Sequence, residues 1–439
     1  MNPTVPSRLR PRERFVLLAA LAYVLMTVLA GPLRMYLSLA GLAPLIYLPN
    51  LLLLLAIGWQ LLAESCEQEF TPMKLVAMVI PCFALMVSLQ FTSAVQAATG
   101  MYVLLPFWFG LACGPVLLDR WRAVGRIVPL LWLVVVTGVL ANQALEYPWE
   151  GFGYNLGELD VEGSRRWYAQ GGVKRLAGFA RASFDAAVQV QIAGILLVLQ
   201  TRGWFLRLLV WALTFAAIIP TNSKGILLVA VVLTPIVLLR RVLPESPLRV
   251  LPTFFGSIGL SLPLSTLLFT FNSPLRDPAL ANATYSLYDR LNDMWPAAWD
   301  LLREQGQLLM GRGFGGIGTA QTYFEPELFN AGDNLFMYWF VVFGWLALPG
   351  FLLVLARSLR LRPHRDAAEM RIYCLLLAIL VYGTMANIVE NALSALVCGL
   401  VVRWLCAAPG TLHSLVAMPA ADKTHVVTAH GGTLHVRYS

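Results

Sequence analysis

The stretch MYVLLPFWFGLACGPVLL, residues 101–118, contains no charged side chain. An apolar stretch of about 18 residues or more is typical of a helix that crosses the roughly 30 Å hydrocarbon core of a membrane. We place such stretches near residues 14–32, 42–62, 74–92, 101–118, 127–145, 183–200, 206–220, 224–240, 250–270, 335–357, 371–389 and 391–408. The sequence therefore predicts an all-α polytopic integral membrane protein with about 12 transmembrane helices, in which residues 1–439 form a single membrane domain. The segment 33–50 is a candidate re-entrant segment.

The composition supports this class. Hydrophobic residues make up 58% of the chain and charged residues 13%, whereas soluble domains are about 45–50% apolar and ~25% charged. The formal net charge of +8 comes from lysines and arginines that gather in short connections between the apolar stretches. We attribute this charge to membrane topology and predict no nucleic-acid partner.

The placement of Lys and Arg also predicts the orientation. Basic residues are enriched in the cytoplasmic loops of membrane proteins. A cytoplasmic N-terminus assigns every strongly basic short connection to the cytoplasm: residues 119–126, 200–207, 240–249 and 357–371. The sequence then predicts a bacterial inner membrane protein with both termini in the cytoplasm. Residues 409–439 are expected to form a disordered cytoplasmic tail.

Two connections are much longer than the others, residues 146–182 and 271–334, and both are expected on the outer face. Neither contains histidine or cysteine, so we expect chemistry there without a metal ion or a cofactor. Five aromatic residues of the first loop are candidates to line a glycan groove: Tyr147, Trp149, Tyr154, Trp167 and Tyr168. In the second loop, Trp295 and Trp299 belong to an amphipathic helical stretch that we expect to lie along the membrane interface.

The second loop also contains MGRGFGGIGTAQTYFEPELFNAGDNLF, residues 310–336. Its glycines at 311, 313 and 316 match the G-x-G-x-x-G pattern of dinucleotide-binding folds. That fold requires a strand before the glycines and a helix after them, and here a helical stretch precedes them. We therefore expect the glycines to form tight turns beside a ligand or a neighbouring helix.

Several motifs occur in an order that resembles the O-antigen ligase and O-antigen (Wzy-type) polymerase superfamily of bacterial membrane glycosyltransferases. The first is R-x-x-G, matched by Arg175 and Gly178, and the second is T-x-S-[K/R]-G in TNSKG, residues 221–225. An arginine in the second loop, Arg290, precedes a run of glycines at 311, 313 and 315. The chain departs from the family at Lys224, where arginine is usual. It also lacks the family's Pro-Asn after the first motif, and has Asp333-Asn334 in place of His-Asn.

The resemblance implies a reaction in which an oligosaccharide is transferred from undecaprenyl diphosphate to a glycan hydroxyl, with inversion at the anomeric carbon. It implies Arg175 and Arg290 as catalytic residues that stabilise the departing diphosphate, because arginine forks onto phosphate oxygens. The candidate substrate-binding residues are Arg181, Lys224, Gly311, Gly313 and Asn334.

Asp333 has two interpretations. It is either the catalytic base that deprotonates the acceptor hydroxyl, or the N-cap of the next helix, and the second is favoured because Asp is a good N-cap. Glu325 and Glu327 are reserve bases. The expected partners are lipid-linked oligosaccharide, membrane lipid, a chain-length regulator and a flippase.

Other functions stay open at this stage. A ligase would transfer the glycan to lipid A-core, and the missing histidine argues against it. A lipid-linked glycan flippase or transporter would share the span count but predicts two similar halves and polar groups at the membrane midplane. A non-catalytic scaffold of a secretion complex is the third alternative.

Overall fold

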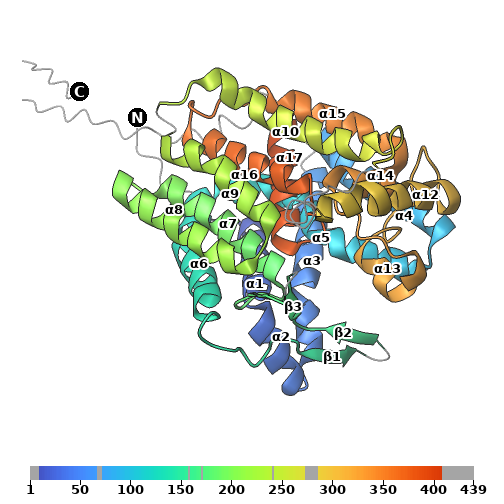
Figure 1. Cartoon of the computed structure of the whole chain (residues 1–439), viewed down its shortest axis with the longest axis horizontal. Helices are drawn as coiled ribbons and strands as arrows, with labels where there is room; N and C mark the ends of the chain where they lie inside the picture. Colours follow the sequence, from blue (N-terminus) through green and yellow to red (C-terminus); the bar gives the residue numbers. More distant parts are fainter. Residues whose placement is uncertain are drawn as a thin grey trace, which may run out of the picture.

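The structure of the protein, a computed structural model, describes residues 9–66, 72–156, 159–169, 172–239, 242–271 and 285–407. The predicted tail over 409–439 lies outside the described residues, as do residues 272–284 of the second long loop. Most of the described chain is helical (Figure 1). The α-helices are α1 (Pro11–Val28), α2 (Ala30–Leu39), α3 (Leu48–Cys66), α4 (Pro72–Phe91), α5 (Ala94–Asp119), α6 (Trp121–Ala141), α7 (Ser183–Gln200), α8 (Trp204–Ile218), α9 (Lys224–Leu239), α10 (Glu245–Ser265), α12 (Trp295–Gln305), α13 (Thr319–Phe324), α14 (Leu335–Phe343), α15 (Ala347–Ser358), α16 (Ala367–Gly383) and α17 (Ala392–Cys406).

Short elements complete the chain. Four are 3-10 helices: η1 (Ala43–Tyr47), η2 (Ile219–Thr221), η4 (Pro326–Leu328) and η5 (Gly344–Leu346). One is a π-helix, η3 (Arg290–Met294). The strands form two antiparallel hairpins, β1 (Gly153–Leu156) with β2 (Leu159–Glu162) and β3 (Trp167–Tyr168) with β4 (Lys174–Arg175).

Seven helical segments of the described chain are long and apolar enough to cross a membrane, and α1 with α2 adds an eighth if this pair, bent by 89°, counts as one broken span. The predicted class, an all-α multi-pass membrane protein, agrees with this architecture. The predicted count of twelve is not confirmed by helix length and composition. Each predicted span nevertheless overlaps a helix, and α4, α9 and α17 include shorter apolar helices.

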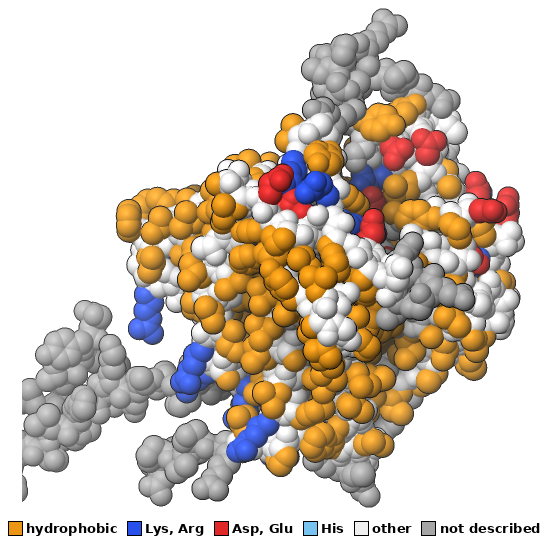
Figure 2. Space-filling model, turned by 90° about the horizontal axis from the view of Figure 1, so that it is seen from below, with side chains coloured by type: hydrophobic (Ala, Val, Ile, Leu, Met, Phe, Trp, Pro, Cys, Tyr) orange, Lys and Arg blue, Asp and Glu red, His pale blue; other side chains and the backbone are white. Residues whose placement is uncertain are grey.

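The surface is apolar over most of its area. Figure 2 shows a broad belt of hydrophobic side chains, with Lys and Arg at the lower left and acidic and basic side chains together at the top. Leu62, Phe205 and Leu268 are 69%, 74% and 79% exposed. Soluble monomers rarely expose apolar patches larger than a few hundred Å², so we interpret the belt as the lipid-facing surface.

The centre of the helical body is the contact between α5 and α17. A Cβ at Gly110 would lie 2.2 Å from the Leu396 carbonyl oxygen, and one at Gly399 would lie 2.0 Å from the Phe107 carbonyl oxygen. Glycines on both helices therefore let the two backbones touch, as small residues do between transmembrane helices. Close packing here fixes the position at which α17 begins, next to the functional residues described below.

The predicted span over 371–389 is too long at its C-terminal end. Helix α16 ends at Gly383, and residues 384–391 are not helical. The polar side chains of this connection explain the break, because Asn391 caps α17 by accepting a hydrogen bond from the Ser394 backbone N–H. The connection also contains Glu390, whose role is described with the site.

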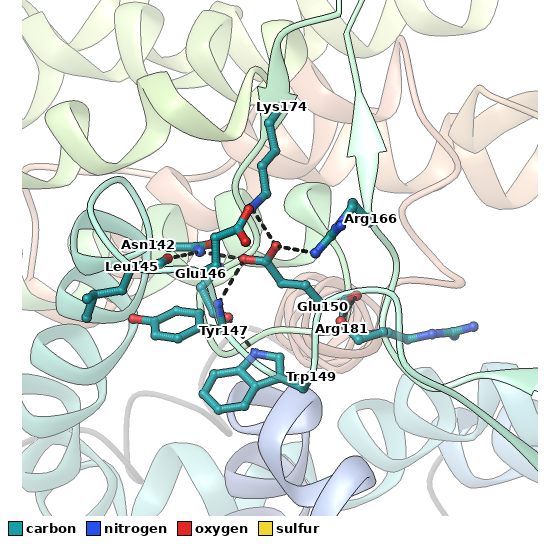
Figure 3. Close-up of polar contacts among 11 residues, drawn as sticks. Asn142, Leu145, Glu146, Tyr147, Trp149, Glu150, Arg166, Lys174 and Arg181 are labelled. Atoms are coloured by element: carbon teal, nitrogen blue, oxygen red, sulfur yellow. Dashed lines mark hydrogen bonds and ion pairs between the residues drawn. The ribbon is translucent and has the colours of Figure 1, made fainter.

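The first long loop is organised around the carboxylate of Glu150 (Figure 3). Its oxygens accept hydrogen bonds from Asn142 Nδ2 at 2.6 Å and form an ion pair with Lys174 Nζ at 2.6 Å, and Arg166 lies 3.6 Å away. The Glu150 side chain is 6% exposed. Burial raises the pKa of Glu150, but the hydrogen bonds from Lys174 and Asn142 outweigh it and hold this pKa below its usual value.

The aromatic residues of the first loop divide into two groups. Tyr147 stacks on Trp149 at 4.6 Å between ring centroids, and Trp149 and Tyr154 are each 7% exposed. Burial of Trp149 and Tyr154 contradicts the glycan-groove role predicted for both, and Tyr147 is half-buried. Trp167 and Tyr168 are 37% and 57% exposed and are accessible to a ligand.

The two tryptophans of the second loop are also buried, contrary to the interface position predicted for them. Trp295 is 0% and Trp299 is 2% exposed. Trp299 donates a hydrogen bond to the Pro263 carbonyl at 3.0 Å and stacks on Trp345. Helix α12 packs against α14, so its apolar side faces the protein and not the lipid.

Candidate functional site

The two motifs that carry the family resemblance in the first half of the chain contact one another. The Leu176 backbone N–H donates to the Pro220 carbonyl at 3.1 Å, and Arg175 Nε donates to the Thr221 carbonyl at 3.2 Å. The R-x-x-G segment of the first loop therefore lies directly on the turn that begins TNSKG. Gly178 is required for packing at this point, because its φ is +58° and a Cβ would lie 2.8 Å from the backbone of Gly138.

Arg175 is half-buried, and its guanidinium already contacts the Thr221 carbonyl and the Trp167 ring. Strand β4 pairs it with Trp167, and its guanidinium lies over the Trp167 ring at 5.6 Å from the centroid. Burial lowers the pKa of Arg175, while the nearby Tyr382 hydroxyl acts in the opposite direction. Within the described residues, the hydrogen bond of the guanidinium is the one from Nε to the carbonyl of Thr221. The two terminal nitrogens of an arginine suit an oxyanion.

Tyr382, near the end of α16, connects the two long loops. Its hydroxyl is hydrogen-bonded to Ser223 of the TNSKG turn, and the charged groups that act on it include Arg175 and Asp333. A Cβ at Gly225 would lie 2.9 Å from the Tyr382 ring, so the glycine of this motif lets the ring approach α9. We call Arg175, Ser223, Tyr382, Asp333 and Arg290 the Tyr382 cluster.

Arg290 and Asp333 form an ion pair within this cluster. Arg290 Nη2 lies 2.7 Å from Asp333 Oδ2, and the two side chains are 17% and 31% exposed. Arg290 Nη1 donates to the Ser286 carbonyl at 2.6 Å, whereas its buried Nε has no partner among the described residues. Arg290 begins η3, and π-helical turns are frequent at functional sites because they displace side chains from regular helical positions.

The Asp333 carboxylate is largely buried and is paired with one cation. Burial raises the pKa of Asp333, and the adjacent Arg290 opposes this shift. Within the described part of the chain, Arg290 is the residue that bonds to the carboxylate, through Oδ2. No hydrogen bond to Oδ1 occurs within the described residues.

The N-cap of α14 is Asn334, so the capping role predicted for Asp333 is wrong. Asn334 Oδ1 accepts the backbone N–H groups of Phe336 and Met337 at 2.8 and 2.9 Å. Its Nδ2 donates to the carbonyls of Gly259 and Thr384 at 2.9 and 3.1 Å, and the residue is 0% exposed. Its side-chain oxygen and nitrogen are therefore both bonded inside the protein, which gives Asn334 a structural role. Its substrate-binding role stays a prediction.

The glycine run is also structural. Gly311 and Gly313 have φ values of +83° and +74°, in the left-handed region that favours glycine. A Cβ at Gly311 would lie 2.3 Å from the Val342 carbonyl oxygen, and one at Gly313 would lie 2.3 Å from Ser88 Oγ. Both residues are buried. They let the second loop pass between α4 and α14. The substrate-binding role of these two glycines stays a prediction.

This packing predicts a large difference between two Gly→Ala substitutions. We expect Gly313→Ala to lower the free energy of unfolding by roughly 2 kcal/mol or more, through overpacking and an unfavourable φ. Gly350→Ala is the matched control, because a Cβ at Gly350, in α15, meets nothing within 4 Å. It should be neutral or stabilising by up to ~1 kcal/mol. Thermal unfolding of both purified variants tests this, and equal melting temperatures would contradict the packing role.

A buried ion pair holds the rest of the second loop. Arg312 is 1% exposed, and its two terminal nitrogens bind both oxygens of Glu325 at 2.8 and 2.9 Å. Gln96 adds a hydrogen bond to Glu325 at 2.9 Å. Burial raises the pKa of Glu325, but these hydrogen bonds outweigh it and lower the pKa. The Glu325 carboxylate is therefore held by the buried Arg312. Glu327 is exposed.

Glu390 is a carboxylate at the site that the sequence interpretation missed. It accepts hydrogen bonds from the Thr319 backbone N–H at 3.0 Å, the Thr319 hydroxyl at 2.8 Å and the Tyr338 hydroxyl at 3.1 Å. Burial raises the pKa of Glu390 to about 7 although these hydrogen bonds lower it. An acidic residue between two apolar segments is by itself a signal of function, and that signal was present in the sequence.

The remaining predicted residues lie at the edge of the cluster. Lys224 is the first residue of α9, and its side chain is exposed. Arg181 is half-buried, and its side chain extends away from the Glu150 network (Figure 3). No group of three His, Cys, Asp or Glu side chains in the described residues is arranged to hold a metal ion.

No family model, no curated protein and no solved structure matches this chain.

Proposed function

We propose that this protein is a glycosyltransferase of the bacterial inner membrane that polymerises repeat units of an exopolysaccharide or O-antigen. It would take a glycan from undecaprenyl diphosphate and transfer it to a glycan hydroxyl at the outer face, with inversion. The observation that carries the proposal is the Tyr382 cluster, in which Tyr382 interacts electrostatically with Arg175 of the first long loop and with Asp333 of the second. Asp333 in turn forms an ion pair with Arg290. The order of the motifs in the sequence supports the same reaction class.

In the proposed reaction, the acceptor hydroxyl oxygen forms a bond to the anomeric carbon as the bond from that carbon to the diphosphate oxygen breaks. Asp333 receives the hydroxyl proton on Oδ1, and lipid diphosphate leaves with the electron pair. Protonation removes the charge that Arg290 neutralises in the resting protein. The Arg290 guanidinium then becomes available to the diphosphate at the moment when negative charge grows there.

Arg175 approaches the same centre from the first loop. Its terminal nitrogens suit a second phosphate oxygen, and Trp167 holds the plane of the guanidinium. In a site that excludes water, such donors stabilise developing charge more strongly than they do in solution. The proposed catalytic residues are therefore Arg175, Arg290 and Asp333, as in the family resemblance.

A flippase is the alternative from a different class, and the position of the charges argues against it. Transporters place their polar groups near the membrane midplane, whereas the Tyr382 cluster is built from loop residues and helix ends. We further propose that both termini are cytoplasmic, and that a chain-length regulator and a separate flippase are partners.

Analysis of lipid-linked glycans in a deletion strain tests the function. A polymerase deletion should accumulate single repeat units on lipid at the outer face and lose all polymer. A ligase deletion would instead accumulate long polymer on lipid. Single repeat units retained at the inner face would show that the protein is a flippase and would refute the proposal.

A further inference from the structure

A second group of basic side chains lies at the same end of the molecule as the loops. It consists of Arg34 on α2 and Arg181, two residues before the start of α7. Each side chain is half-buried and each has a buried Nε with no hydrogen-bond partner in the described chain. An unsatisfied donor on a buried arginine is costly, so two of them in one place require an explanation.

The backbone brings these two arginines together. The Gly31 backbone N–H, one turn before Arg34, donates to the Phe179 carbonyl at 2.8 Å, two residues before Arg181. A Cβ at Gly31 would lie 2.4 Å from the Trp149 ring, so this contact is tight. The bend of 89° between α1 and α2 places α2 across the loop end of the molecule, beside the hairpins (Figure 1).

Arg181 is fixed from the other side as well. Its carbonyl accepts hydrogen bonds from the Arg165 backbone N–H at 2.8 Å and from Ser164 Oγ at 3.3 Å. Figure 3 shows its guanidinium pointing away from Glu150, the carboxylate that Lys174 and Arg166 share. Arg166 and Lys174 therefore share Glu150, whereas the buried Nε of Arg181 has no hydrogen-bond partner among the described residues.

Three tyrosines surround the arginine pair. The hydroxyls of Tyr47 and Tyr154 lie 3.1 Å apart, and the rings of Tyr47 and Tyr102 lie 6.0 Å apart. All three tyrosines act electrostatically on Arg34. Tyr102 is 38% exposed, so the group is open to a ligand. Tyrosines offer an apolar ring and a hydroxyl donor together, as a sugar or phosphate headgroup requires.

The charge of the group is incompletely balanced. Asp185 is the acidic side chain that acts on both arginines, and its carboxylate is shared with the amide of Asn391. Arg165 also faces Asp185 but is paired with Glu162. Among the described residues, the guanidinium groups of Arg34 and Arg181 therefore face the single carboxylate of Asp185, which leaves one positive charge for a ligand.

We propose that Arg34 and Arg181 form an oxyanion-binding site that takes a phosphate or carboxylate group of the glycan-lipid substrate, separate from the Arg290–Asp333 pair. Guanidinium groups bind such groups through paired N–H donors. The oxyanion comes either from the lipid diphosphate or from an acidic sugar of the glycan. The identity of the ligand rests on the proposed function. The binding of an oxyanion by Arg34 and Arg181 is measured without glycosyl transfer, so it can fail or hold separately from that function.

Binding of three probes to the purified full-length protein in lipid nanodiscs tests this site. The probes are farnesyl diphosphate, a disaccharide that contains glucuronic acid, and a neutral glucose disaccharide. The proteins are wild type, Arg34→Gln, Arg181→Gln and the control Arg166→Gln, whose side chain is 42% exposed and paired with Glu150. We expect at least one oxyanion probe to bind about 10-fold more weakly to both test variants, and as in wild type to the control.

The probe that loses affinity identifies the source of the oxyanion, and either source supports the site. Arg34→Lys is the control for misfolding, because lysine keeps the charge and the apolar stem of the side chain. Since lysine lacks the paired N–H donors of arginine, this variant should bind the oxyanion probe with intermediate affinity. The proposal is overturned if Arg34→Gln and Arg181→Gln bind both oxyanion probes as wild type does. It is also overturned if the neutral disaccharide loses affinity to the same extent as the acidic one.

Discussion

Arg290→Lys should reduce polymer synthesis nearly as much as Arg290→Ala, by about 100-fold or more, with normal protein abundance. Arg290 uses two nitrogens at once, one toward the Ser286 carbonyl at 2.6 Å and one toward Asp333 at 2.7 Å, and keeps a third free. Lysine has a single ammonium group. It cannot reproduce the planar set of N–H donors with which a guanidinium contacts several oxygen atoms at once. Polymer length and amount on gels, normalised to protein level, provide the measurement.

Arg303 provides the matched control for this experiment. It lies on α12 of the same loop, is 51% exposed and pairs with Asp300 at 3.2 Å. Its Lys and Ala variants should both keep nearly full synthesis, because exposed ion pairs contribute little. If Arg290→Lys keeps most of its polymer while Arg290→Ala does not, then Arg290 supplies charge alone and the bidentate role is refuted.

Neighbouring substitutions at Asp333 and Asn334 should give opposite phenotypes. Asp333→Asn retains the size of the side chain but cannot take a proton, so synthesis should fall by about 10²-fold or more at normal abundance. Asn334→Ala removes a cap worth about 0.5–2 kcal/mol and leaves the carbonyls of Gly259 and Thr384 without their donor. It should therefore lower the amount of folded protein.

Protein abundance by immunoblot and polymer per unit of protein separate the two effects. Full synthesis by Asp333→Asn would exclude Asp333 as the base and direct attention to Glu390. Normal abundance of Asn334→Ala would show that the cap and its two carbonyl contacts contribute little to stability.

The helical architecture was predictable from the sequence because hydrocarbon offers no hydrogen-bond partners to the backbone. Backbone polar groups in hydrocarbon must be satisfied within the segment, so a long apolar stretch such as residues 101–118 has few alternatives to a helix. The predicted span over 371–389 was too long because residues 384–391 include polar side chains and are not helical. The polar side chains there stop α16 early, and a sliding hydropathy window averages them with their apolar neighbours.

The site was predictable only in part, because its geometry depends on contacts between distant segments. The motif order pointed to Arg175 and Arg290, which the fold brings to one cluster. Nothing in the local sequence distinguishes Asp333 from Asn334 as the cap, since helix boundaries are uncertain by one or two residues. Tyr382 resembled one more aromatic residue of an apolar span, and only its contacts with Ser223 and both loops give it a role.

Reconstitution of the purified protein with undecaprenyl-diphosphate-linked repeat units tests the proposed chemistry most directly. Without nucleotide, the products should be free undecaprenyl diphosphate and a lipid-linked glycan of two or more repeat units joined with inverted configuration. Arg290→Ala should release no undecaprenyl diphosphate, and Arg303→Ala should release it as wild type does. Polymer formation that continues at the wild-type rate in Arg290→Ala, or a wild-type protein that moves the lipid-linked glycan across the membrane without releasing undecaprenyl diphosphate, would contradict the assignment.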